Sequence, residues 1–415
     1  EIINLRHKRS KILGYKSHAN FVLEERMSLT EKNTNHFIDE LYIKSFPFAK
    51  KEWDELTLFS KQNLAINKLE KWDIAFATEK LKKSSLNLDE LELKKYFSLN
   101  NVLLGLFKIL DKLYGLTFKL NDKIDVYAKS VKAYEVYDRN KKFKSLLYLD
   151  LYPRAGKRSG AWMTSYIGQK KNQRPHVSIV CNFQAESKSK PSLISFQDVT
   201  TLFHEFGHAL HGMLANTDYE SLSGTNVLWD FVELPSQIME NWCYEEKALK
   251  IFAKHYKTNK TIPQLFIKKI KAASHFQQGI QTLRQLGFAS LDLSYHSINS
   301  NTIKNIKKHE DLILNKFHFL KPDKNQCLSS SFSHIFQGGY SAGYYSYKWA
   351  EVLDADAFEL FLENGIFNSE IARKFEENIL SKGGTEHPMK LYKRFRGKEP
   401  DPEALIRRAG LILAE

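Results

Sequence analysis

The segment His204-Glu205-Phe206-Gly207-His208 constrains this chain more than any other part of its sequence. In a helix, residues four positions apart lie on the same face, one turn above the other. Two imidazoles placed in this way can bind one metal ion. Zinc accepts histidine nitrogen, and in catalytic sites it keeps one position for water. Glu205 lies beside that face and can accept a proton from the metal-bound water. The segment therefore predicts a catalytic zinc site on a helix.

The residues around this motif predict that the helix is buried. A glycine in a helix interior costs about 1 kcal/mol relative to alanine, so Gly207 is best explained if another segment packs closely against it. An exposed helix with two incidental histidines is the alternative. However, two buried imidazoles and a buried carboxylate without partners would be costly, and a metal removes that cost. The apolar neighbours are Leu202, Phe203, Phe206, Ala209 and Leu210.

A third ligand has to come from another segment. The longer zinc motif with a further glycine and histidine needs glycine where this chain has His211. Glu233 is the better candidate, because Pro235 suits the first turn of a new helix and places Glu233 at its start. Spacing alone equally allows Glu233 to be an acidic residue favoured by the helix dipole. Glu240, on the same helical face, either orients a ligand histidine or is a surface charge.

A glycine-rich and tyrosine-rich stretch, His334–Tyr347, is the second informative segment. Its glycines permit unusual backbone conformations, and its tyrosines supply phenol donors. Peptide hydrolysis by an activated water creates an oxyanion, and donors aimed at that charge lower the barrier. For Tyr344 and Tyr345 we favour the alternative, that they are aromatic residues of the core.

Hydrophobic periodicity predicts a mainly α fold. Residues 1–130 are expected to be helical, with the clearest helical spacing in Asn35–Ile43, Glu55–Leu69 and Val102–Tyr114. Strands are expected at Lys144–Tyr152 and His176–Phe183, followed by a long helix over Phe196–Leu214. Helices are expected to dominate from Glu233 onwards, apart from a loop at 298–330 and a turn at Gly383-Gly384.

Composition excludes several classes of protein. The formal net charge is +14, but the lysines are scattered and no nucleic-acid-binding motif is present, so the charge is read as solvated surface rather than as a nucleic-acid site. No stretch is long and apolar enough to cross a bilayer. Cys181, Cys243 and Cys327 are odd in number and far apart, which argues against a disulfide framework and favours a reducing compartment. We therefore expect a cytoplasmic protein.

These segments together resemble the thimet oligopeptidase family of zinc metallopeptidases. The resemblance rests on Thr201–His211, on Val232–Gln237 with Met239–Trp242, and on the His334–Tyr347 loop. It extends to Tyr148–Tyr152, Gly160–Met163 and Lys393–Gly397. It covers nearly the whole chain, and the combination of motifs is highly specific.

The resemblance implies a mainly α, neurolysin-like fold, with two helical lobes and a small β-sheet next to the HExxH helix. In such a fold the site lies deep in a channel that admits short peptides and excludes folded proteins. One zinc ion per chain is implied. The implied zinc ligands are His204, His208 and Glu233, the general base is Glu205, and the other active-site residues are Tyr340, Tyr347 and His334.

The resemblance also bears on the organisation of the chain. Members of the family are considerably longer on the N-terminal side, and Glu1–Arg6 reads as helix interior without a capping residue. Residues 1–415 are therefore expected to be a catalytic region without the N-terminal part of the family. The expected sub-lobes are a helical one at 1–143 and a zinc-site one at 144–415. The His176–Phe183 strand would lie by the site and could bind substrate backbone as an added strand.

The resulting hypothesis is a monomeric zinc metalloendopeptidase that hydrolyses internal bonds of short peptides. A peptidyl-dipeptidase of the same family is the close alternative. It would need a cation near the primed subsites for the terminal carboxylate, and the sequence does not identify one. A non-catalytic peptide-binding remnant is the other alternative. The complete His-Glu-x-x-His motif and the tyrosine-rich loop argue against a remnant. The expected lack of the family's N-terminal part argues for one.

Overall fold

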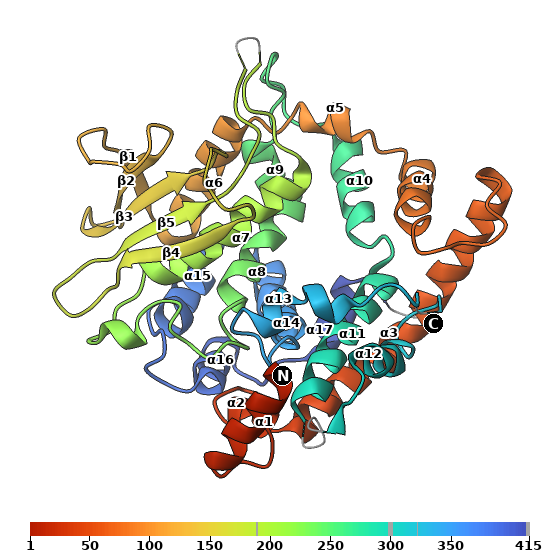
Figure 1. Ribbon diagram of the computed structural model, residues 1–415. Helices are drawn as coiled ribbons and strands as arrows, with labels where there is room; N and C mark the ends of the chain where they lie inside the picture. Colours follow the sequence, from red (N-terminus) through yellow and green to blue (C-terminus); the bar gives the residue numbers. More distant parts are fainter. Residues whose placement is uncertain (188–189, 298–301, 322, 412–415) are drawn as a thin grey trace.

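The computed structural model describes residues 1–187, 190–297, 302–321 and 323–411. Figure 1 shows a mainly helical molecule with one small sheet to the left and the helices α3, α4, α11 and α12 to the right. Helices α8, α13 and α14 lie between these two parts. The expected mainly α fold, with a small sheet beside the helix that carries His204 and His208, is confirmed.

The helices before the sheet are α1 Ile2–Ile12, α2 His18–Leu23, α3 Glu31–Asn63, α4 Ile74–Leu86, α5 Glu90–Lys94 and α6 Leu99–Tyr114. Those after it are α7 Phe196–Met213, α8 Leu234–Glu240, α9 Glu246–Phe252, α10 Gln264–Ser274, α11 Gln278–His296, α12 Ile306–Leu314, α13 Ser333–Phe336, α14 Ser346–Asn364, α15 Ser369–Phe375, α16 Pro388–Arg396 and α17 Pro402–Arg408.

The sheet has the strand order β1-β2-β3-β5-β4, which corrects one expectation. The strands are β1 Thr117–Leu120, β2 Lys132–Tyr137, β3 Phe143–Asp150, β4 Trp162–Ile167 and β5 His176–Val180. Strand β5 pairs with β3 in parallel and with β4 antiparallel, so both of its edges are occupied. The expectation that His176–Phe183 could bind substrate as an added strand is therefore wrong, because β5 has no free edge. The edge strand on this side of the sheet is β4.

Helix α7 packs against strands β3, β4 and β5, so the sheet supports the helix that carries the two histidines. The helix begins with a capping box, in which Ser195 and Asp198 satisfy each other's backbone N–H groups. Its apolar residues from Val199 to Met213 are fully buried. The expected helix over Phe196–Leu214 is confirmed to within one residue at its C-terminal end.

Two large apolar clusters stabilise the molecule. One contains the inner residues of the sheet and buried residues of α6, α7, α8, α9, α15 and α16. The second contains buried residues of α1, α2, α3, α11, α14 and α17 and of the tyrosine-rich loop. Trp349, in α14, is partly buried against both clusters. The two histidines and the tyrosine loop are therefore built on different cores.

Several element predictions differ from the structure. Strand β1 interrupts the region expected to be entirely helical up to residue 130, and β2 and β4 were not predicted. The expected loop at 298–330 contains α12 and a short 3-10 helix at Leu328–Ser331, while 298–301 and 322 lie outside the described residues. The turn at Gly383-Gly384 is confirmed. Among the described residues, no helix is both long enough and apolar enough to span a bilayer.

Candidate metal centre

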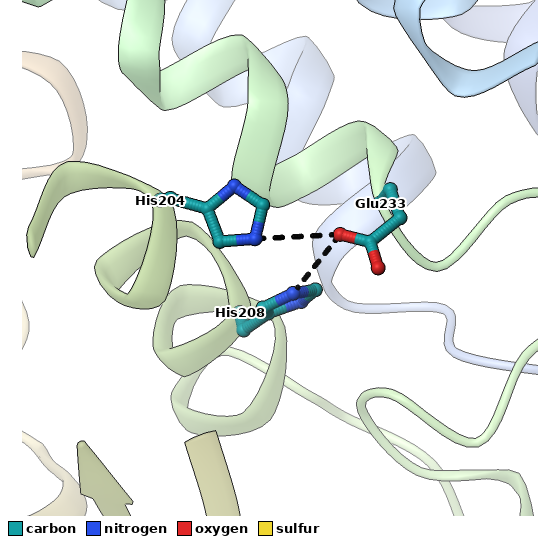
Figure 2. A group of neighbouring side chains, drawn as sticks. All are labelled: His204, His208 and Glu233. Carbon is teal, nitrogen blue, oxygen red and sulfur yellow. Dashed lines mark ion pairs between the residues drawn. The ribbon is translucent and has the colours of Figure 1, made fainter. Parts of the chain in front are cut away.

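His204, His208 and Glu233 converge on one point, as Figure 2 shows. The Nε2 atom of His204 lies 3.4 Å from Oε2 of Glu233, and Nε2 of His208 lies 3.2 Å from the same oxygen. Their metal-binding atoms all lie within 4.8 Å of one another. Two imidazoles and one carboxylate are a common donor set for catalytic zinc. The residues predicted to bind zinc are therefore brought together in the arrangement that a shared ion requires.

Glu233 reaches this point because α8 crosses α7 at very close range. A Cβ atom added to Gly207 would lie 2.1 Å from the carbonyl oxygen of Pro235 and 2.4 Å from Cα of Ser236. The inference that another segment packs on Gly207 is confirmed. Pro235 lies in the first turn of α8, as predicted, and Glu233 immediately precedes the helix. The glycine thus determines how near the carboxylate comes to the two histidines.

Gly207→Ala is expected to destabilise the protein by about 1–3 kcal/mol, because an inserted methyl group in a packed core forces backbone to move. The obstacle here is the backbone of α8 rather than a flexible side chain. Thermal denaturation of the purified variant measures the effect. Gly287→Ala is the matched control, since its added Cβ would lie 3.2 Å from the Phe317 side chain and needs only a small adjustment. Equal stability of parent and Gly207→Ala would contradict this explanation.

Glu240 orients the first histidine. Its Oε1 lies 2.7 Å from Nδ1 of His204. When Nδ1–H donates to this carboxylate, the lone pair of a neutral imidazole remains on Nε2, which faces Glu233. Burial lowers the pKa of His204, but the two carboxylates of Glu233 and Glu240 outweigh burial and raise this pKa well above its ordinary value. Of the two roles considered for Glu240, the structure shows the orienting contact.

Glu205 is buried and lines the same cavity as the three candidate metal ligands. Its Oε2 atom has no hydrogen-bond partner among the described residues. Burial raises the pKa of this carboxyl, and the neighbouring His204 and His208 oppose that shift. A buried carboxylate with a free oxygen is costly unless something completes its environment. A metal ion with its water at this point fits that need.

Two tyrosines of the loop approach the site. The hydroxyl of Tyr340 donates to Oε1 of Glu233 at 3.0 Å. The ring of Tyr347 stacks on that of Tyr340, with 4.9 Å between ring centroids. Burial raises the pKa of both phenols, that of Tyr347 to about 12. Both therefore keep their protons near neutral pH and remain hydrogen-bond donors.

The other aromatic residues of the loop have different surroundings. The ring of His334 lies near those of Tyr340, Tyr344 and Tyr347, with centroids 5.8–6.5 Å apart. His334 does not line the cavity that contains the candidate metal ligands. Tyr344 and Tyr345 are buried. The hydroxyl of Tyr345 donates to the buried carboxylate of Asp230 at 2.7 Å. The interpretation of Tyr344 and Tyr345 as core residues agrees with this burial.

The site opens into a cavity of about 530 Å³. Sequence reasoning missed Trp229 as part of its wall. Trp229 packs edge-on against Tyr340 and so closely on Gly339 that a Cβ there would lie 2.1 Å from the indole. In the sequence, only the position of Trp229 four residues before Glu233 indicated that it could belong to the cavity wall. The start of β4 forms another part of the wall. The lining residues are Ala161, Trp162, Met163, His204, Glu205, His208, Thr225, Asn226, Val227, Trp229, Val232, Glu233, Tyr340 and Tyr347.

Comparison with known proteins agrees with this site. Oligopeptidase A of Escherichia coli strain K12 is 40% identical over 419 residues, which cover 99% of this chain and 62% of that protein. Dipeptidyl carboxypeptidase of the same strain is 34% identical over 415 residues, covering 99% of this chain and 61% of that protein. The chain thus spans about three fifths of the length of these relatives.

A solved structure shows the same fold. PZ peptidase A with a bound inhibitor superposes with a TM-score of 0.59 at 16% identity, covering 98% of this chain and 62% of the other. At that identity the likeness concerns the fold alone. The model of the family described as peptidase family M3 matches residues 1–411. With the matched span covering both histidines, Glu233 and the tyrosine loop, this chain belongs to peptidase family M3.

Proposed function

We propose that the chain is the catalytic region of a zinc-dependent oligopeptidase that hydrolyses internal bonds of short peptides. The observation that carries this proposal is the convergence of His204, His208 and Glu233 beside the unpartnered carboxylate oxygen of Glu205. The names of the relatives, oligopeptidase A and dipeptidyl carboxypeptidase, agree with peptide hydrolysis. One zinc ion per chain would be held by the two Nε2 atoms and the Glu233 carboxylate.

When bound, zinc supplies Lewis acidity, which polarises the scissile carbonyl and lowers the pKa of water. Glu205 then performs the proton transfers. Its free oxygen accepts a proton from the attacking water and later delivers it to the leaving amine. Burial favours this role, because it raises the pKa of Glu205 and makes the carboxylate a better base. Glu240 keeps the proton on Nδ1 of His204, so that Nε2 stays available as a ligand.

The phenols of Tyr340 and Tyr347 are the donors that face the reaction. The hydroxyl of Tyr340 is hydrogen-bonded to Glu233, and the ring of Tyr347 stacks on the ring of Tyr340. Because both phenols stay protonated near neutral pH, Tyr347 can donate to an oxyanion that forms on the substrate carbonyl, and Tyr340 can do so once its O–H leaves Glu233. His334 contacts both rings, and we propose that it supports them from behind.

The edge strand β4 is the proposed binding surface for substrate backbone. Trp162 and Met163, at its start, line the cavity with the metal ligands. Its partner strand β5 occupies only one of its edges, so a peptide can add along the other by main-chain hydrogen bonds. Main-chain recognition of this kind binds short extended peptides with little dependence on their sequence.

The cavity favours an endopeptidase over a dipeptidyl carboxypeptidase. Among the residues that the structure describes, its lining includes no lysine or arginine that would bind a substrate's terminal carboxylate. A hydrogen bond to a charged group contributes about 1.5–3 kcal/mol. An enzyme that depends on such a contact therefore loses more than about tenfold in rate when the carboxylate is removed.

A pair of fluorogenic peptides tests this proposal. One ends in a free carboxylate and the other in an amide, and both are incubated with the purified chain and zinc. We expect cleavage of the same internal bond, at rates within about threefold of each other, because no charged contact is lost. Mass spectrometry identifies the products, and a chelator should stop both reactions. Release of C-terminal dipeptides from the free acid alone would establish the dipeptidyl carboxypeptidase instead. Binding of both peptides without cleavage would indicate the non-catalytic alternative.

A further inference from the structure

A buried carboxylate outside the metal centre anchors the tyrosine loop. Asp292, in α11, is 1% exposed. Its Oδ1 accepts the backbone N–H of Ala342 and its Oδ2 accepts that of Tyr344, each at 2.9 Å. Ala342 lies in the left-handed region, with φ +54°. Backbone N–H groups around a left-handed residue form a concavity that binds anions. The carboxylate and this strained turn are therefore complementary.

The carboxylate of Asp292 is connected through His296 to Arg6 in α1. Nδ1 of His296 lies 2.8 Å from the backbone carbonyl oxygen of Asp292 and 3.0 Å from its Oδ1, and Nε2 of His296 lies 2.9 Å from a guanidinium nitrogen of Arg6. When Nδ1–H donates to Asp292, the lone pair on Nε2 accepts from Arg6. The same guanidinium nitrogen donates to the carbonyl of Ile335 at 2.7 Å, next to His334. This network links Asp292 to the start of the loop at Ile335 as well as to Ala342 and Tyr344 within it.

We propose that Asp292 is a positioning residue that acts through the loop: its carboxylate sets the turn that brings Tyr340 and Tyr347 to the metal centre. Ala342 comes two residues after Tyr340, and Tyr344 comes three residues before Tyr347. Two clamped N–H groups between the two tyrosines determine where both phenols lie. The inference deepens the proposed function and rests on it, because it assigns those phenols a part in the reaction.

Asp292→Asn is the most informative substitution. It preserves the size of the side chain, but an amide offers one acceptor oxygen and one NH2 donor. One of the two loop N–H groups then faces another donor. The turn at Ala342 loses half of its anchor and gains a repulsive contact, while the metal ligands on α7 and α8 are untouched.

Hydrogen–deuterium exchange measures the loop without any need for activity. In the parent chain the amides of Ala342 and Tyr344 should be protected. In Asp292→Asn the segment 338–345 should exchange at least about tenfold faster, because opening it then breaks fewer hydrogen bonds. Unchanged exchange in this segment would overturn the proposal.

Kinetics on the zinc-loaded chain provide the second measurement. We expect kcat of Asp292→Asn to fall about 10- to 100-fold, as misplaced groups do in other enzymes. KM should change little, and the zinc content should equal that of the parent. A variant that keeps the parent kcat, or that loses zinc, contradicts a role through the tyrosines.

A double-mutant cycle separates positioning from general destabilisation. Asp292→Asn is also made in a chain that carries Tyr340→Phe and Tyr347→Phe. If Asp292 acts through the two phenols, its further effect on kcat should shrink to under about threefold, because coupled residues are not additive. An undiminished, multiplicative loss would show that Asp292 does not act through them.

Glu310→Gln is the matched control. Glu310, in α12, is also a buried carboxylate, and it accepts the backbone N–H groups of Leu328 and Ser329 at 3.0 and 2.8 Å. That segment carries none of the proposed site residues, so kcat per folded molecule should stay at the parent value. Failure of the proposed function would be visible in the parent chain itself, as an absence of zinc-dependent cleavage. If only the positioning role is wrong, the parent chain cleaves peptides and Asp292→Asn has the same kcat as the parent.

Discussion

Replacing Glu205 with glutamine should remove most peptide hydrolysis and leave zinc bound. The amide has nearly the same shape, but it cannot accept the proton of the attacking water. General acid–base catalysis contributes about 10²–10⁴-fold, so kcat should fall by a factor in that range. None of the three proposed ligands is altered, and elemental analysis should still find zinc at the parent level. The measurement is kcat on a fluorogenic peptide at saturating zinc.

Glu376→Gln is a suitable control for this substitution. Burial also raises the pKa of Glu376, but that residue lies near Lys144 and Arg139 and does not line the cavity of the candidate metal ligands. The kcat of the Glu376→Gln variant should equal that of the parent. If Glu205→Gln retained the parent kcat, the general base would have to be another residue, and the proposed mechanism would be wrong.

Glu233→Ala should abolish stable zinc binding. Two imidazoles would remain, and a catalytic zinc site normally uses three protein ligands. Loss of a residue that only orients a ligand costs about 10–100-fold in metal affinity, so loss of a direct ligand should cost more than about 100-fold. The phenol of Tyr340 would also lose its acceptor. Competition with a fluorescent zinc chelator measures the affinity.

Glu240→Gln provides the graded comparison. It removes the carboxylate that orients His204 but leaves all three proposed ligands in place. Its zinc affinity should fall by about 10–100-fold, between the parent and Glu233→Ala. A Glu233→Ala chain that still bound one zinc ion with the parent affinity would exclude Glu233 as a ligand.

The candidate metal centre was largely predictable because its signals are local. The spacing of His204 and His208 fixes their common face once the segment is helical. Gly207 then indicated a close neighbour, and α8 is that neighbour. Spacing alone left Glu233 undecided between ligand and helix-dipole charge, because the path of the intervening loop depends on packing. The crossing of α7 and α8 brings the carboxylate of Glu233 beside both imidazoles.

The sheet was predicted less well. Strands β1, β2 and β4 are four to six residues long, too short for an alternating pattern to stand out. Which strand forms the edge depends on pairing between distant segments, so β5 was mistaken for the strand that could accept substrate. The anchor of the tyrosine loop was equally hidden. Asp292 lies about fifty residues before Ala342, and only the folded chain brings them together.

X-ray absorption at the zinc edge, together with elemental analysis of the purified chain, tests the central claim most directly. The account predicts one zinc ion per chain, bound by two histidine nitrogens and carboxylate oxygen at about 2.0–2.2 Å, without sulfur. A folded chain that binds no zinc, or a zinc spectrum without scattering from imidazole rings, would contradict it.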